Sequence, residues 1–152
     1  MATQATTLHA SAVLVGARAV LIRGPSGSGK SRLALDLIET GRTGALPFAR
    51  LVADDRVYLE AANGRLVARP AEALAGLIEI RGVGLLRIAH EPGAVIGLVI
   101  DLAAADATRL PDIDLRKTEI DGIILPRLAV AFTVSPLPHV LALLNSPEDN
   151  WV

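Results

Sequence analysis

Short apolar runs, separated by glycines, prolines and charged residues, make up the pattern of this chain. Two such runs, 9–15 and 18–23, predict strands joined by a short turn. From Leu33 to about Glu39 the apolar residues instead recur at helical spacing, and we expect Gly41 to end that helix. The first part of the chain therefore predicts two strands and a helix.

The rest of the chain predicts mostly strands. An apolar run over 51–55 is followed by a hairpin whose turn, Asn63-Gly64, is typical of type I′ geometry. A long apolar run over 95–102 predicts a strand buried on both faces. The remaining expected features are a short helix after Pro70, extended segments over 78–82, 85–88 and 123–125, a polar surface segment over 103–121 and a helical turn or two over 140–144. Together these elements predict an α/β protein.

Composition narrows the class of protein. The 152 residues are 51% apolar and 20% charged, which predicts a single domain over 1–152 with a large aliphatic core. The net charge of −1 gives no reason to expect nucleic acid or an anionic membrane as a partner. There is no cysteine, so disulfides and thiolate metal sites are excluded. No apolar stretch resembles a signal peptide or a membrane span, and we expect a cytoplasmic protein.

A phosphate-binding motif lies between the second predicted strand and the helix. It has the form G-x-x-x-x-G-K-[ST] and consists of Gly24, Pro25, Ser26, Gly27, Ser28, Gly29, Lys30 and Ser31. In such a P-loop, backbone N–H groups and the helix N-terminus surround a phosphate. Lys30, one of only two lysines in the chain, would reach the β- and γ-phosphates, and the Ser31 hydroxyl would bind Mg²⁺. The motif predicts that the protein binds ATP or GTP.

Two adjacent acids, Asp54 and Asp55, end the apolar run at 51–55. A carboxylate at a strand end beside the phosphates commonly holds Mg²⁺, and in a kinase it can accept the proton of the attacking hydroxyl. Adjacent residues of a strand point to opposite faces, so one acid would face the phosphates while the other pairs with an arginine. The alternative from the residues alone is a solvated Asp-Asp turn.

Four segments in this order resemble the catalytic domain of bacterial HPr kinase/phosphorylase. They are His9-Ala10, the P-loop strand and motif over 21–31, Leu-Val-Ala-Asp-Asp at 51–55 and Ile-Glu-Ile-Arg-Gly-Val-Gly-Leu at 78–85. The resemblance covers about residues 9–110. It implies ATP-dependent phosphorylation of a serine of HPr, the phosphocarrier protein of the sugar phosphotransferase system, and removal of that phosphate by phosphorolysis.

The resemblance also implies roles for single residues. His9 matches an active-site histidine, and Glu79 matches a second metal ligand. The aspartate pair contains the proton acceptor; we favour Asp55 over Asp54. Arg109 matches an arginine that would supply positive charge during transfer. Taken alone, His9 would be an ordinary strand-end histidine and Glu79 a member of an edge-strand ion pair.

This chain departs from the family pattern at several points. Ala10 replaces a glycine, Arg32 replaces an acid after the P-loop serine, and about six residues are inserted over 43–49. Only 125–128, Leu-Pro-Arg-Leu, resembles the family's P-V-R-P-G-R-N loop, which is linked to dephosphorylation. We therefore expect a short member with kinase activity, and phosphorylase activity is doubtful.

The family architecture implies a mixed-sheet P-loop fold related to phosphoenolpyruvate carboxykinase, and a homohexamer. Two other readings of the residues stay open. One is a P-loop kinase acting on a small molecule. The other is a catalytically silent module that senses nucleotide and signals through a partner, which Ala10, Arg32 and the missing loop favour. Turnover distinguishes them, because a silent module binds ATP and transfers nothing.

Overall fold

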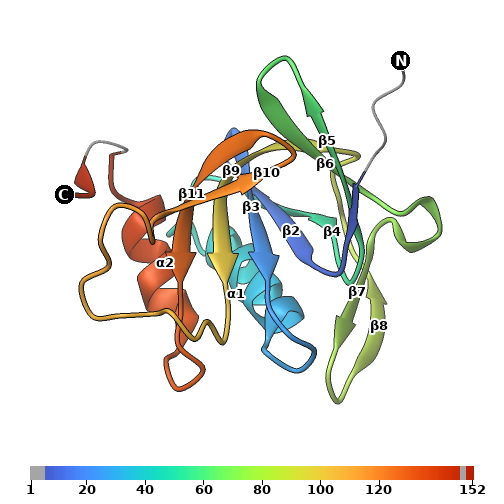
Figure 1. Ribbon diagram of the computed structural model, residues 1–152. Helices are drawn as coiled ribbons and strands as arrows, with labels where there is room; N and C mark the ends of the chain where they lie inside the picture. Colours follow the sequence, from blue (N-terminus) through green and yellow to red (C-terminus); the bar gives the residue numbers. More distant parts are fainter. Residues whose placement is uncertain (1–5, 148–149) are drawn as a thin grey trace.

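Residues 6–147 and 150–152 are described by a computed structural model of the chain. The strands are β1 (Thr6–Leu8), β2 (Ser11–Val15), β3 (Arg18–Arg23), β4 (Ala49–Ala53), β5 (Val57–Ala62), β6 (Arg65–Pro70), β7 (Leu77–Ile80), β8 (Gly84–Arg87), β9 (Ala94–Asp101), β10 (Lys117–Ile120) and β11 (Ile123–Ala129). The helices are α1 (Lys30–Arg42), α2 (Pro136–Leu144) and a 3₁₀ turn, Glu72–Leu74. Nine of these strands form one mixed sheet, and β7 and β8 form a separate hairpin (Figure 1). The fold is therefore mixed α/β, as predicted.

The sheet branches at β9. Its strand order is β1-β5-β6-β9-β3-β2-β4, with β11 also paired to β9 and β10 paired to β11. Strands β3, β9 and β11 are parallel, and Arg23, Asp101 and Ala129 are in register at their carboxyl ends. The loops that follow these three strands consequently leave the sheet at one edge, the lower edge in Figure 1.

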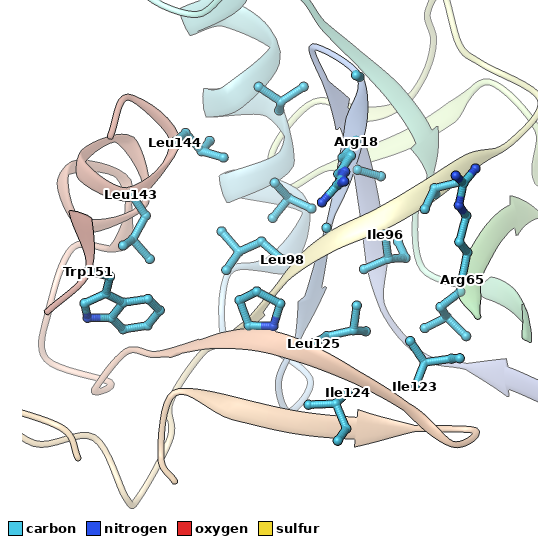
Figure 2. A pocket seen from close by; sticks show the side chains of 18 of the residues that line it. Arg18, Arg65, Ile96, Leu98, Ile123, Ile124, Leu125, Leu143, Leu144 and Trp151 are labelled. Atoms are coloured by element: carbon cyan, nitrogen blue, oxygen red, sulfur yellow. The ribbon is translucent and has the colours of Figure 1, made fainter. Parts of the chain in front are cut away.

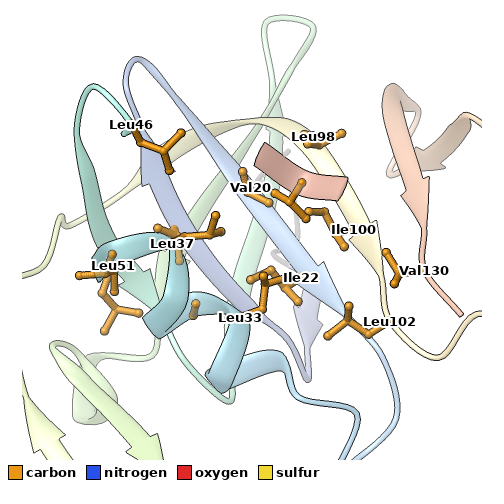
Figure 3. Packing of buried hydrophobic residues seen from close by; sticks show 14 of the residues in the cluster. Val20, Ile22, Leu33, Leu37, Leu46, Leu51, Leu98, Ile100, Leu102 and Val130 are labelled. Atoms are coloured by element: carbon orange, nitrogen blue, oxygen red, sulfur yellow. The ribbon is translucent and has the colours of Figure 1, made fainter. Parts of the chain in front are cut away.

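Two apolar clusters cover the two faces of the sheet. One lies under α1 and α2, where Leu33 and Leu37 of α1 face Ile22 of β3 and Ile100 of β9 (Figure 3). The other is formed by β2, β4, β5, β6, Leu125 of β11 and the opposite faces of β3 and β9. Because each fully buried leucine or isoleucine contributes roughly 1.5–3 kcal/mol, these clusters fix the strands from which the loops emerge.

Several predicted elements are confirmed. Strand β9 occupies nearly the whole run predicted over 95–102. The β5–β6 hairpin turns at Asn63 and Gly64, whose φ values of 53° and 73° fit the type I′ turn. The short helix expected after Pro70 is the 3₁₀ turn.

The end of α1 differs from the prediction. Gly41 lies inside the helix, which continues to Arg42, and the left-handed residue beyond the helix is Gly44, with φ of +83°. Glycine is required at position 41 for a different, steric reason. A Cβ atom there would lie 2.7 Å from the Ala49 Cβ and 3.0 Å from the Ala49 backbone nitrogen. It lets α1 approach β4 closely.

Other differences concern weakly patterned segments. Strand β10 lies in the segment predicted as polar surface, and α2 begins at Pro136 rather than near 140. His9, predicted to begin a strand, lies in the bend between β1 and β2. No helix within the described ranges has the length and apolar content needed to cross a bilayer.

Candidate active site

The P-loop connects β3 to α1 at the carboxyl edge of the parallel strands. At its start, Gly24 (φ +156°) packs against the end of β9, and a Cβ atom there would lie 3.1 Å from both Leu102 Cβ and Leu102 O. The Leu102 N–H donates a 2.9 Å hydrogen bond to Arg23 O. The beginning of the P-loop is therefore fastened to the neighbouring strand.

Lys30 is folded onto its own loop. Its Nζ donates to the carbonyl oxygens of Gly24 at 2.8 Å and Pro25 at 3.1 Å, and the residue is 8% exposed. These bonds hold the ammonium group against the first residues of the loop, beside the N-terminus of α1. This is where a lysine must lie to meet bound phosphates, because the loop N–H groups and the helix N-terminus converge there.

Asp54 is the buried centre of the site. It is 3% exposed and accepts three hydrogen bonds. Its Oδ1 accepts from the hydroxyls of Ser11 and Ser31, both at 2.7 Å, and its Oδ2 accepts from the Glu79 backbone N–H at 2.9 Å. For Asp54, the solvated-turn alternative is wrong. The carboxylate joins β2, α1 and β7 beside the P-loop.

Asp55 has the opposite environment. Its φ of 70° turns the chain after Asp54, and its Oδ1 lies 2.6 Å from His9 Nε2. The side chains of His9 and Asp55 are 56% and 59% exposed. The two acids do point apart, as expected, but Asp55 pairs with a histidine and not with an arginine. The site thus combines one buried carboxylate and one exposed imidazole–carboxylate pair.

The remaining predicted residues, Glu79 and Arg109, lie at the periphery. Glu79 joins the site through its backbone N–H, while its side chain is exposed. Among the described residues, no three His, Cys, Asp or Glu side chains gather closely enough to hold a metal ion by themselves. Arg109 is exposed in the loop that follows β9, at the P-loop edge of the sheet. The metal role of Glu79 and the charge role of Arg109 stay predictions.

Sequence reasoning missed a chain of ion pairs beside the P-loop. Arg23 donates to Asp101 through Nε at 2.7 Å and Nη2 at 2.8 Å, and Arg127 Nε donates to Asp101 Oδ2 at 2.6 Å. Arg127 also donates two 2.9 Å bonds to Asp106. Burial raises the pKa of Asp101, but hydrogen bonds and charges from Arg23 and Arg127 outweigh it and hold that pKa below its usual range.

The sequence signal for this network was weak. An acid at the end of a buried strand and an arginine at the end of another are informative only if the two strands are known to be neighbours. The network fixes the loop that carries Arg109 near both of its ends, because Arg127 donates to Asp106 and to the Leu115 carbonyl.

A cavity of about 810 Å³ lies at the other edge of the sheet and does not belong to this site. It is bordered by the starts of β3, β9 and β11, by α2 and by Trp151, and its walls are mostly aliphatic (Figure 2). Arg18 and Arg65 also line it. None of the predicted site residues does, so its size does not make it the place of phosphate chemistry.

Comparisons with known proteins point to one family. The family model described as HPr Serine kinase C-terminal domain matches residues 1–133. An HPr kinase/phosphorylase of Streptococcus thermophilus is 44% identical over 90 residues, which cover 59% of this chain and 27% of that protein. One of Streptococcus pneumoniae is 36% identical over 138 residues, which cover 82% of this chain and 42% of that protein.

A solved structure gives the same result for the fold. The Hpr(Ser) kinase/phosphatase from Coxiella burnetii aligns with a TM-score of 0.72 and 27% identity, over 91% of this chain and 93% of that one. The chain spans less than half the length of the two curated relatives. With a family model matched over most of its residues, this chain belongs to the HPr serine kinase C-terminal domain family.

Proposed function

We propose that this chain is a protein serine kinase domain that transfers the γ-phosphoryl group of ATP to a serine of HPr. The observation that carries the proposal is that the two adjacent aspartates occupy different environments. Asp54 is buried against the P-loop serine, Ser31, whereas Asp55 is exposed with His9 at the mouth of the site. Family membership supports HPr as the acceptor.

The P-loop would bind the nucleotide phosphates. Residues 24–31 offer backbone N–H groups and the N-terminus of α1, and Lys30 adds a positive charge. Phosphoryl transfer consists mainly of positioning and charge neutralisation. In this proposal Lys30 moves from the loop carbonyls to the phosphates when ATP binds, and Arg109 adds charge from its loop.

The oxygen donors beside the P-loop fit Mg²⁺. The Ser31 hydroxyl and the Asp54 carboxylate already lie 2.7 Å apart, and Mg²⁺ is typically held by one or two carboxylates together with substrate phosphates and water. Ser31 and Asp54 would hold the ion, with Glu79 as a second acidic ligand. When bound, Mg²⁺ neutralises charge on the β- and γ-phosphates.

Asp55 is the proposed proton acceptor. Asp54 already accepts three hydrogen bonds, whereas Asp55 is exposed and, among the described residues, pairs with His9 alone. The serine hydroxyl would donate its proton to Asp55 as its oxygen attacks the γ-phosphorus and the bond to ADP breaks. His9 orients the carboxylate through the 2.6 Å contact to Oδ1.

Broader features belong to the same proposal and are supported by the family resemblance. They are a phosphoenolpyruvate-carboxykinase-like fold, a single catalytic domain over 1–152, a cytoplasmic location and a homohexamer. The relatives named above are kinase/phosphorylases, and the structural neighbour is named a kinase/phosphatase. Phosphorolysis would use the same groups in reverse, with Asp55 returning the proton.

The decisive experiment measures phosphate transfer from γ-labelled ATP with Mg²⁺ to HPr of the same organism. A second HPr, with its acceptor serine replaced by alanine, is the control. We expect labelling of the first HPr alone, and addition of inorganic phosphate to the product tests the reverse reaction. Bound ATP without labelling would contradict the kinase proposal and support the nucleotide-sensing module. Labelling of a metabolite would support the small-molecule kinase.

A further inference from the structure

We propose that Arg81 is a catalytic residue that contacts the terminal phosphates of the nucleotide bound in the P-loop. This inference rests on the proposed nucleotide site and gives a specific contact to one residue of the 78–85 segment that the family resemblance includes. The inference is based on where the Arg81 side chain lies relative to the P-loop. The Arg81 Nη2 atom lies 4.0 Å from the point where a Cβ atom on Gly27 would stand, so its guanidinium reaches over the middle of the P-loop.

The hairpin that carries Arg81 is attached to the active site. Strand β7 is anchored by Ile78, which is fully buried in the cluster under α1. The next residue, Glu79, donates its backbone N–H to Asp54, and Arg81 follows two positions later, at the hairpin turn. In Figure 1 this hairpin descends along the P-loop edge of the sheet. The buried aspartate therefore also sets the position of Arg81.

The turn itself is ordered by its backbone. The Val83 N–H donates to Ile80 O at 2.9 Å, and the base of the hairpin is closed by a 2.8 Å bond from Ile88 N–H to Gly76 O. Arg81 thus extends from a short, hydrogen-bonded turn. A guanidinium held in this way loses less conformational entropy on binding a phosphate than one on a long loop.

Arg81 also has hydrogen-bonding capacity to spare. Its side chain makes no hydrogen bond or ion pair to any residue of the described ranges, and it is exposed. By contrast, Arg23 and Arg127 are engaged by Asp101. A guanidinium presents several donors in a planar fork that matches two phosphate oxygens.

The chemistry of transfer explains what such a contact would do. Negative charge is spread over the γ-phosphoryl oxygens in the transition state, and an arginine supplied in the same chain can stabilise it. Arg81 lies above the central P-loop glycine, whereas Arg109 lies on the loop after β9. Arg81 would donate to β- or γ-phosphate oxygens from the side of the hairpin, and Lys30 from the loop below.

The test compares Arg81→Ala and Arg81→Lys with the matched control Arg87→Ala. Arg87 is exposed on the same hairpin but pairs with Leu77 at its base, away from the turn. Binding of fluorescent ATP, ADP and AMP analogues is measured with the full chain and Mg²⁺, without HPr. We expect Arg81→Ala to weaken ATP binding about tenfold, the loss typical of a charge-assisted hydrogen bond, and ADP binding less. AMP binding and the Arg87→Ala variant should be unchanged.

Turnover gives the second measurement. Arg81→Ala should lower kcat for HPr phosphorylation by at least about 10²-fold, and Arg81→Lys should recover ATP binding better than kcat. Wild-type ATP affinity and kcat in Arg81→Ala would overturn the inference while leaving the kinase proposal intact. If HPr is never labelled but Arg81→Ala still loses ATP affinity selectively, the phosphate contact stands and the proposed acceptor is wrong. Circular dichroism and the melting temperature of each variant verify that the hairpin change leaves the fold intact.

Discussion

Neighbouring residues of identical chemistry occupy different environments in this site. Asp54 is buried and binds three donors from three elements, whereas Asp55 takes a left-handed backbone conformation and an exposed position beside His9. A left-handed φ is uncommon for residues other than glycine, although aspartate tolerates it better than most. The turn that places Asp55 at the site mouth therefore carries a small backbone cost.

The different environments of Asp54 and Asp55 predict different kinetics for the variants Asp54→Asn and Asp55→Asn. Asp55→Asn should lower kcat by about 10²–10⁴-fold with ATP affinity nearly unchanged, because only the proton acceptor is lost. Asp54→Asn should weaken Mg²⁺-dependent ATP binding as well, since Ser31 would lose its carboxylate partner. Steady-state kinetics together with nucleotide binding separate the cases. Equal losses of ATP affinity and kcat in Asp55→Asn would show that Asp55 works on the metal or the structure instead.

At the scale of elements, the ion pairs at the strand ends tie β3, β9 and β11 together. The side chain of Asp101 is 17% exposed and lies between two arginines. Removing one partner of a largely buried charge network is costly because it leaves the other charges uncompensated. The pKa of Asp101 is lowered in the folded state, so its ionised form stabilises the fold.

Because folding lowers the pKa of Asp101, the stability that its carboxylate contributes depends on pH. The contribution of Asp101 is fully present above the unfolded carboxyl pKa of about 3.9 and is lost as pH falls through the lower folded value. Asp101→Asn should therefore cost on the order of 3 kcal/mol at pH 7, and the difference from wild type should shrink below about pH 4. Urea unfolding at a series of pH values measures this. Asp114→Asn, at an exposed acid, is the control, and a pH-independent difference would contradict the ion-pair account.

Helix α1 and strand β4 meet where Gly41 lies. In an open helix, Gly→Ala would stabilise by about 1 kcal/mol. Here the added methyl group would meet the Ala49 Cβ at 2.7 Å and the Ala49 backbone nitrogen at 3.0 Å, and the backbone cannot move aside cheaply. Gly41→Ala should therefore destabilise the protein by about 1–3 kcal/mol. A stabilised variant in equilibrium unfolding would show that the helix can shift away from the strand.

At the scale of the whole molecule, the sequence predicted those elements whose structure depends on residues close together in the chain. The strand–loop–helix arrangement around residues 24–31 and the type I′ hairpin follow from sequence spacing and turn chemistry, and both lie where expected. Gly41 shows where prediction from local sequence fails. Its position near a helix end suggested a cap, but its neighbour across the fold, Ala49, decides its role.

The parts that the sequence did not reveal depend on distant partners. The pairing of Asp101 with Arg23 and Arg127 requires knowledge of which strands are adjacent. Strand β10 has little apolar alternation because, within residues 6–147, it is an outer strand that pairs with β11 alone. Arg81 belongs to the family-matched segment 78–85, but its position over the P-loop depends on the hairpin that carries it.

The three bonds to Asp54 also concern how the chain folds. Their donors, Ser11, Ser31 and Glu79, are separated from Asp54 by 43, 23 and 25 residues along the chain. Each bond requires a long loop to close, and such non-local contacts form slowly compared with a helix. During refolding, the far-UV signal of α1 should return before phosphate transfer does. Catalytic activity would then be a late marker of folding, recovered only when separate parts of the chain have converged on one carboxylate.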